Sequence, residues 1–338
     1  MSTARLVIAG ARPFVLFAAT AGPRRGFGHL VRCGVLADGL DVNRTAMLHG
    51  ASRAAERAAR RLGWSLTTWP RATARRLPDL LVVDDPSAAR TGAWVRRART
   101  HGVAVATIHD GLPPQATPDL AIDGSAVSRH ADDTRRVAGP SFVILRDADP
   151  RRSTRLAPVT PPRVLVALGG GAHVRHVGAR VAAAIARRRP DATVDLAAGF
   201  MPGRLPRLPS GCRWIAAPDG LADALAGASV SVVAGGITLY EACALGTPAV
   251  AVAVVRAQQP AIDAVVRARA ALTTRLDGPD GADRVARLVC ELIDQPVLRR
   301  TLRRNAQRLI DGRGAARVVA RLSRLIHRHR RDAIDAVA

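Results

Sequence analysis

The amino-acid sequence predicts an α/β protein with two domains, each containing a parallel sheet covered by helices on both faces. Three observations support this fold class. Short apolar runs alternate with Ala- and Arg-rich stretches of helical length, the runs are continuously apolar, and the alternation restarts after a Pro-rich segment near the middle. The length of 338 residues also suits two domains of about 150 residues each.

The expected elements follow this alternation along both halves of the chain. In the first half we expect strands at residues 14–19, 80–84, 103–108 and 120–122, and helices at residues 30–40, 51–62 and 91–100. In the second half we expect strands at residues 163–168, 193–198, 230–233 and 249–255, and helices at residues 177–188, 221–226 and 239–245. Ligands bind at the carboxyl ends of such strands, so the two domains are expected to face a cleft.

The domain boundary is predicted at residues 147–162, which are rich in Pro and charge and lack periodicity. We therefore place the domains at residues 1–150 and 160–325, followed by a basic tail at residues 326–338. Before that tail, one helical face carries five apolar residues: Val318, Val319, Leu322, Leu325 and Ile326. A packed terminal helix with a basic outer face explains this pattern best, and a helix lying on a membrane surface stays open as peripheral membrane contact.

Composition and charge exclude several classes of protein. All 51 basic residues are Arg, against 27 acidic residues, which gives a net charge of +24. Because the Arg residues are spread along the whole chain and aromatic residues make up only 3%, we expect no specific nucleic-acid partner. The four cysteines are far apart, and no apolar run reaches about 18 residues, so we expect a cytoplasmic protein without disulfides, zinc or a transmembrane segment.

The first stretch with chemical potential is the sequence GFGHLVR at residues 26–32, after the first predicted strand. Gly26 and Gly28 allow close approach of the backbone to a ligand, and the helix start attracts anions. His29 lies where the helix dipole favours a neutral imidazole able to accept a proton, and Arg32, one turn further, is suited to pair with a phosphate or carboxylate. A glycine turn with a structural histidine would give the same pattern.

The second stretch is GGITLYEA at residues 235–242, directly after a buried strand. Gly235 and Gly236 before a helix predict a phosphate site built from backbone N–H groups. Glu241, one turn inside the helix, is placed to accept the two hydroxyl groups of a ribose. Thr238 and Glu241 also match a capping box, which needs no ligand.

Further candidates follow other predicted strands. Gln258 and Gln259 come after the strand at residues 249–255, and Gly169 and Gly170 end the first strand of the second domain. Acid or base groups at strand ends of the first domain, ranked below His29, are Asp84, Asp85, His109 and Asp110. The sequence has no G-x-G-x-x-G motif, no phosphate-loop lysine and no His/Cys metal cluster, so we expect metal-free acid–base chemistry without a cofactor.

Together these stretches resemble the nucleotide-sugar enzymes of the GT-B fold, in which two Rossmann-like domains face a cleft. The closest resemblance is to the family of the UDP-2,4-diacetamido-2,4,6-trideoxy-β-L-altropyranose hydrolase of pseudaminic acid biosynthesis and related spore-coat polysaccharide proteins. The segments that carry it are residues 26–32, 139–146, 164–170, 235–248, 258–259 and 311–315. Ile237 replaces a small hydroxyl residue common in that family, and Gln258 replaces its usual Asn.

The resemblance implies a nucleotide-binding second domain and a first domain that faces the sugar and the acceptor. UDP would contact Gly235, Gly236 and Thr238 through its phosphates and Glu241 through its ribose, while His29 would transfer a proton at the sugar carbon. The leading hypothesis is a UDP-sugar hydrolase that cleaves at the anomeric carbon. The alternatives are a GT-B glycosyltransferase with a UDP-sugar donor and a non-catalytic nucleotide-sugar-binding protein.

Overall fold

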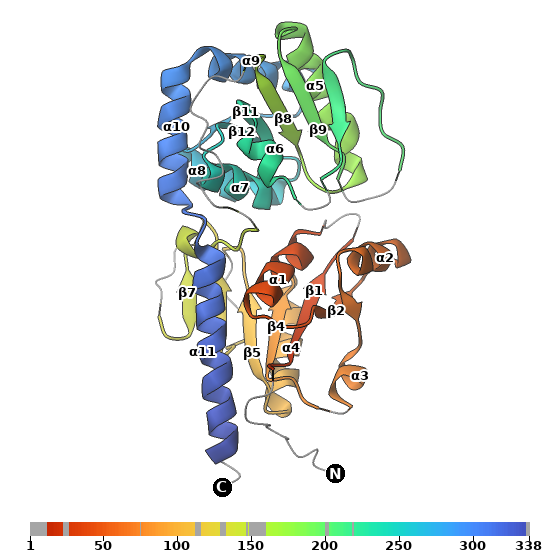
Figure 1. Cartoon of the computed structure of the whole chain (residues 1–338), viewed down its shortest axis with the longest axis vertical. Helices are drawn as coiled ribbons and strands as arrows, with labels where there is room; N and C mark the ends of the chain where they lie inside the picture. Colours follow the sequence, from red (N-terminus) through yellow and green to blue (C-terminus); the bar gives the residue numbers. More distant parts are fainter. Residues whose placement is uncertain are drawn as a thin grey trace. The chain divides into compact units, whose positions relative to one another are not determined.

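The computed structural model describes residues 12–22, 27–74, 76–111, 116–128, 133–146, 148, 160–199, 203–217 and 220–335. The chain divides into two compact units (Figure 1). Unit 1 comprises Met1–Ile144 and Gly314–Ala338, and unit 2 comprises Leu145–Arg313. Each unit is an α/β structure with one parallel sheet, which confirms the predicted fold class. Most of the predicted boundary segment lies outside the described residues.

Unit 1 has a seven-stranded parallel sheet in the order β3-β2-β1-β4-β5-β6-β7. The strands are β1 (Val15–Thr20), β2 (Thr45–His49), β3 (Ser65–Leu66), β4 (Leu80–Asp84), β5 (Ala104–Ile108), β6 (Leu120–Asp123) and β7 (Arg136–Ala138). All residues of β1, β4 and β5 are buried, which explains their continuously apolar sequences. The chain order reverses between β1 and β4, and the carboxyl edge at such a reversal is where open α/β sheets bind ligands.

Strand β2 was absent from the sequence prediction. Only Ala46 and Met47 are buried in it, and its first residue and last two residues are partly or fully exposed. Such a short apolar centre gives no continuous run by which a buried strand is recognised. Its place beside β1 depends on pairing with a strand nearly 30 residues away, in register from Phe17 with Ala46 to Thr20 with His49.

Most helices of unit 1 begin at a serine cap or at a glycine. They are α1 (Gly28–Gly39), α2 (Arg53–Arg61), α3 (Trp69–Thr73), α4 (Ala88–Thr100), the short 3₁₀ helix η1 (Pro140–Phe142) and α11 (Gly314–Asp335). Ser52 caps α2 by accepting from the Ala55 N–H, and Ser87 caps α4 by accepting from the Arg90 N–H.

Helix α11 joins unit 1 although the sequence prediction assigned it partly to the second domain and partly to a basic tail. Val318, Leu322, Leu325 and Ile326 are buried, so its apolar face is the one the sequence predicted. The helix packs against α1 and against β5 and β6. The apolar face of α11 explains why the helix belongs to unit 1, because packing it against the first sheet removes this face from water.

Two close contacts fix α11 in unit 1. A Cβ built at Gly39 of α1 would lie 2.6 Å from Val319 Cγ2, so only glycine allows this approach of the two helices. Near the other end, the Arg330 guanidinium donates to both oxygens of Asp79, at 3.1 and 2.9 Å. The Asp79 side chain is 5% exposed, so this is a largely buried ion pair.

Unit 2 has a six-stranded parallel sheet in the order β10-β9-β8-β11-β12-β13. The strands are β8 (Arg163–Ala167), β9 (Thr193–Ala197), β10 (Cys212–Ile215), β11 (Val230–Ala234), β12 (Ala249–Val252) and β13 (Leu272–Thr273). The chain order reverses between β8 and β11, as it does between β1 and β4 in unit 1. Strand β12 ends at Val252, three residues earlier than predicted, because residues 253–255 turn toward the next helix.

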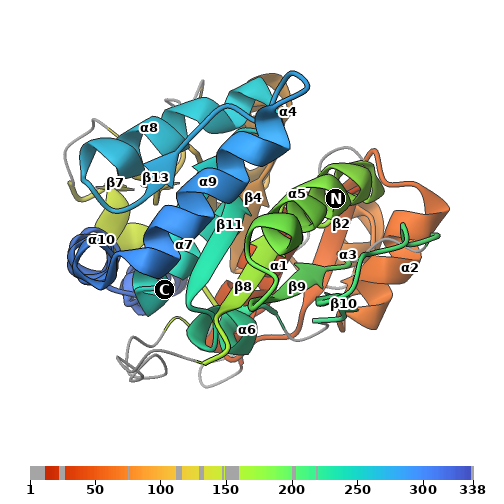
Figure 2. The same ribbon diagram turned by 90° about the horizontal axis from the view of Figure 1, so that it is seen from above.

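The helices of unit 2 are α5 (Arg175–Arg188), α6 (Ala222–Ala226), α7 (Ile237–Leu245), α8 (Gln259–Arg267), α9 (Gly281–Asp294), α10 (Pro296–Leu309) and the 3₁₀ helices η3 (Ala172–Val174) and η4 (Arg256–Gln258). Helices α5 and α9 lie side by side over the sheet (Figure 2) and bury an apolar core that includes Val181, Ile185, Val285 and Val289. No helix within the described residues has the length and apolarity needed to cross a membrane.

Candidate active site

The reversal between β1 and β4 places two sequence candidates next to each other. His29 is the second residue of α1, which follows β1, and Asp84 is the last residue of β4. Phe27, 2% exposed, precedes α1 and anchors its start. Gly26 lies outside the described residues, and Gly28 is the first residue of the helix.

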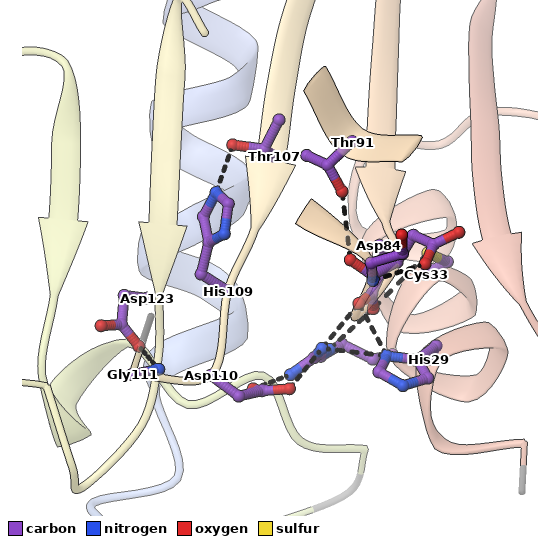
Figure 3. Close-up of polar contacts among 12 residues, drawn as sticks. His29, Cys33, Asp84, Thr91, Thr107, His109, Asp110, Gly111 and Asp123 are labelled. Carbon is purple, nitrogen blue, oxygen red and sulfur yellow. Dashed lines mark hydrogen bonds and ion pairs between the residues drawn. The ribbon is translucent and has the colours of Figure 1, made fainter. Parts of the chain in front are cut away.

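His29 and Asp84 form a hydrogen-bonded pair. The Nδ1 atom of His29 lies 2.8 Å from Asp84 Oδ1 (Figure 3). An ionised carboxylate only accepts hydrogen bonds, so Nδ1 carries the proton in this pair, and in the neutral ring Nε2 holds the lone pair. The Arg32 Nη2 atom is also 3.3 Å from Nδ1, but Arg32 has a shorter bond, 2.7 Å, to Asp84 Oδ1. We therefore assign the Nδ1 proton to the bond with Asp84.

Arg32 joins Asp84 to a second carboxylate. Its Nε and Nη2 groups donate to the two oxygens of Asp84 at 2.8 and 2.7 Å. Its Nη1 and Nη2 groups donate to the two oxygens of Asp110 at 2.7 and 3.2 Å. Asp110 is 54% exposed, whereas the side chains of Arg32 and Asp84 are 8% and 1% exposed. The guanidinium of Arg32, which the sequence predicted to pair with a phosphate or carboxylate, thus pairs with two aspartates of the protein.

Burial and charge shift the ionisation of this cluster. Burial disfavours the charged forms of Asp84 and His29, but the opposite charges and hydrogen bonds dominate. The Arg32 guanidinium and His29 hold the pKa of Asp84 well below its usual range. Asp84, assisted by Asp110 and opposed by Arg32, raises the pKa of His29 above its ordinary value. Cys33, whose thiol lies 4.0 Å from Asp84 Oδ2, has a raised pKa because of burial and the Asp84 charge.

Two other candidates of the first domain are held in different contacts. Asp85 accepts from the Arg90 guanidinium at 2.7 Å and from the Ser87 N–H at 2.8 Å, which is turn and helix-start chemistry. The ring of His109 lies 2.6 Å from the hydroxyl of Thr107, and burial lowers its pKa. The structure therefore brings Asp84 to His29 and Asp110 to Arg32, and it gives Asp85 and His109 local contacts.

The glycine pairs of unit 2 lie where that sheet reverses. Gly169 and Gly170 follow β8, and Gly235 and Gly236 follow β11, the neighbouring strand. A Cβ at Gly235 would lie 2.6 Å from the carbonyl oxygen of Gln258, so packing requires this glycine. Gly236 is exposed, and a Cβ there would meet nothing within 4 Å. Gly236 therefore leaves space for a ligand at the start of α7.

Helix α7 does not start with the capping box that Thr238 and Glu241 matched in the sequence. Its N-cap residue is Gly236, with no side-chain cap, and Thr238 lies inside the first turn. Thr238 and Glu241 are both half-buried. Of the two glutamines, Gln258 accepts from the Val254 N–H at 2.8 Å, and Gln259 donates to Asp263 at 2.8 Å. Both amides thus have contacts within their own turn.

The described part of the chain has no evident metal site. Among those residues, no group of three or more His, Cys, Asp or Glu side chains is arranged to hold a metal ion. The four cysteines are free thiols.

No protein-family model and no curated protein matches the chain. Several solved structures do match. The calicheamicin glycosyltransferase CalG4 has 16% identity and a TM-score of 0.64, covering 94% of this chain and 99% of its own. The MurG protein of Acinetobacter baumannii has 13% identity and a TM-score of 0.60, covering 91% and 99%. The spinosyn rhamnosyltransferase SpnG, complexed with thymidine diphosphate, has 15% identity and a TM-score of 0.61, covering 90% and 98%.

These comparisons correct the leading functional prediction. The predicted UDP-sugar hydrolase is wrong, because the matched structures with established names are mainly glycosyltransferases, which favours the stated alternative. The specific resemblance to the pseudaminic acid hydrolase family has no support among them. With coverage of at least 90% of both chains in each of the three cases, the similarity establishes that this chain has the GT-B fold.

Proposed function

We propose that the protein is a glycosyltransferase that moves a sugar from a nucleoside diphosphate donor to a hydroxyl group of an acceptor. The observation that carries the proposal is the His29–Asp84 pair at the reversal of the first sheet, with Nδ1 held by the carboxylate at 2.8 Å. Such a pair leaves Nε2 as a general base. The GT-B fold and the thymidine diphosphate bound to SpnG are consistent with a nucleotide donor.

In the proposed reaction, the acceptor oxygen attacks the anomeric carbon of the donor sugar. The acceptor hydroxyl loses its proton to Nε2 of His29, and the bond between the anomeric carbon and the diphosphate oxygen breaks. Asp84 stabilises the imidazolium that forms, because its negative charge lies at the opposite ring nitrogen. The nucleoside diphosphate leaves with the electron pair of the broken bond.

We assign the diphosphate to the start of α7 in unit 2. The first N–H groups of a helix are unpaired within the helix and carry partial positive charge, which suits a diphosphate. Gly236 leaves open space at this point. Glu241 is the proposed ribose contact, and Gly169, Gly170 and Thr238 are further candidates near the same strand ends. Because the start of α7 supplies N–H donors to the diphosphate, we infer metal-independent transfer.

The test combines donor screening with a matched pair of variants. UDP- and TDP-sugars are incubated with a panel of hydroxyl acceptors, and glycosylated products are identified by mass spectrometry. Replacing His29 by Ala should lower kcat by about 10²–10⁴-fold, the usual contribution of a positioned base, with little change in nucleotide affinity. The control is His327→Ala, since His327 is exposed on α11. Nucleotide release that is independent of any acceptor, or unchanged turnover of His29→Ala, would contradict the proposal.

A further inference from the structure

Arg32 has no part in the proton transfer just described, yet it is the most highly connected side chain of the cluster. Four hydrogen bonds between 2.7 and 3.2 Å direct its guanidinium at Asp84 and Asp110. The two carboxylates are far apart in sequence: Asp84 is the last residue of β4, and Asp110 follows the adjacent strand β5. Placing an arginine here requires burial of a charge that is costly unless fully paired.

We propose that Arg32 is a positioning residue that acts on His29 through Asp84, with Asp110 as the counter-ion that offsets its charge. The planar guanidinium holds both oxygens of Asp84, which fixes the plane of the carboxylate and keeps it ionised. One of these oxygens, Oδ1, also receives the Nδ1 proton of His29. The orientation of the imidazole and its tautomer therefore depend on Arg32.

The need for Asp110 follows from the geometry around His29. The Arg32 Nη2 atom lies 3.3 Å from Nδ1 of the imidazole, where its charge opposes an imidazolium. The groups that act on His29 are Arg32 from α1, Asp84 from the end of β4 and Asp110 from the turn after β5. With both aspartates ionised, these three groups carry one net negative charge. Proton uptake by His29 then makes the cluster neutral.

Two substitutions should shift the titration of His29 in opposite directions. Asp110→Asn keeps the size of the side chain and removes a negative charge that raises the pKa of His29, so His29 should titrate at lower pH than in the parent. Arg32→Gln removes the positive charge at 3.3 Å, so His29 should titrate at higher pH than in the parent. The matched control is Asp38→Asn, which removes the same charge from an exposed pair with Arg44 elsewhere on α1 and should leave His29 unchanged.

The measurement is NMR titration of ¹⁵N-labelled histidine in the full chain without substrate, with the His29 signals assigned from His29→Ala. The nitrogen shifts should report the tautomer with the proton on Nδ1. Asp110 is half-exposed, so Asp110→Asn is expected to fold even where Arg32→Gln does not. An unchanged His29 titration in folded Asp110→Asn would overturn the proposal, as would the tautomer with the proton on Nε2 in the parent.

The inference rests on the proposed function only for its effect on rate. If the protein transfers sugars, the acid limb of the pH profile of kcat should move to lower pH in Asp110→Asn, in step with the titration. A shifted titration in a protein without transferase activity would refute the proposed function and leave the role of Arg32 standing. If the protein is a transferase but neither its pH profile nor the His29 titration changes in Asp110→Asn, the role of Arg32 alone is refuted.

Discussion

Asp84 is the residue on which the candidate site depends. It is almost fully buried, yet it accepts from the imidazole of His29, from two groups of Arg32 and, more weakly, from the Cys33 thiol. A buried carboxylate with this many donors stays ionised and has one orientation. Its position at the end of β4, directly beside β1, makes it the natural partner for a base at the start of α1.

Substitution of Asp84 by Asn should therefore reduce turnover without abolishing nucleotide binding. An amide cannot fix the imidazole tautomer, and it removes the charge that stabilises the imidazolium, so we expect kcat to fall by about 10²–10⁴-fold. The acid limb of the pH profile should move to lower pH, because Asp84 raises the pKa of His29. Steady-state kinetics across pH, with nucleotide affinity measured by calorimetry, tests this. An acid limb that stays in place would show that His29 is not the titrating base.

His29 should affect activity and stability with opposite dependence on pH. Its pKa is raised in the folded protein, so its ionic contribution to stability is fully present below the ordinary value of 6.5 and is lost as pH rises through the higher folded value. Activity of a general base rises over the same range. We expect the free energy of unfolding of the parent to fall relative to that of His29→Gln as pH increases through this range, measured by denaturant titration. A difference independent of pH would contradict the sign of the shift.

At the scale of the elements, glycines decide how closely segments approach. Gly246 ends α7 in the left-handed region at φ 70°, a backbone conformation that commonly stops a helix at glycine. A Cβ at this position would also lie 2.7 Å from Arg303 Cγ and from Gln307 Nε2, both on α10. The residue therefore serves the backbone conformation and the packing of α7 against α10 at once.

Replacing Gly246 by Ala should destabilise unit 2 through both effects, by about 1–4 kcal/mol. The matched control is Gly278→Ala, because Gly278 has φ 76° but open space around its Cβ position. That control should cost only the left-handed backbone strain, about 1 kcal/mol. Chemical denaturation of both variants separates the two contributions. Equal destabilisation would mean that α10 adjusts freely to the added methyl group.

At the scale of the whole molecule, unit 1 is completed by the last helix of the chain. Unit 2 is inserted in the sequence between Ile144 and Gly314. Helix α11 therefore packs on the first sheet although 169 residues separate it from the rest of unit 1. The apolar face of α11 and the Arg330–Asp79 pair make this return favourable. Stability of unit 1 is thus linked to a segment that a division by sequence alone assigns elsewhere.

The contribution of this return can be measured through Arg330. Burial raises the pKa of Asp79, but Arg330, the Phe14 N–H and Arg76 lower it overall, so the carboxylate is ionised in the fold. Arg330→Met should leave it with only the Arg76 and Phe14 N–H bonds among those named and destabilise unit 1 by about 1–3 kcal/mol. Hydrogen exchange should show reduced protection in β4, β5 and α1, with unit 2 unchanged. Arg328→Met, at an exposed position of the same helix, should have little effect.

The sequence by itself determined the fold class and most of the central strands, and it singled out His29 as a candidate. Continuously apolar runs and glycine turns are local signals, because a strand buried on both faces must be apolar throughout and a helix start near a ligand must be small. The same signals located the two glycines before α7 and the end of that helix at Leu245. Strand β2 was not predicted, because its buried centre is too short to form a continuous apolar run.

Only the tertiary structure decided which groups act together. Arg32 meets Asp84 and Asp110 across 52 and 78 residues, and Gly235 meets Gln258 through the neighbouring β12 segment. These meetings follow from strand order, which depends on the pairing of β1 with β4 and of β4 with β5. Periodicity in a sequence reports how each segment is buried but not which segment lies beside it. The partners of His29, the internal role of Arg32 and the return of α11 therefore became visible only in the folded chain.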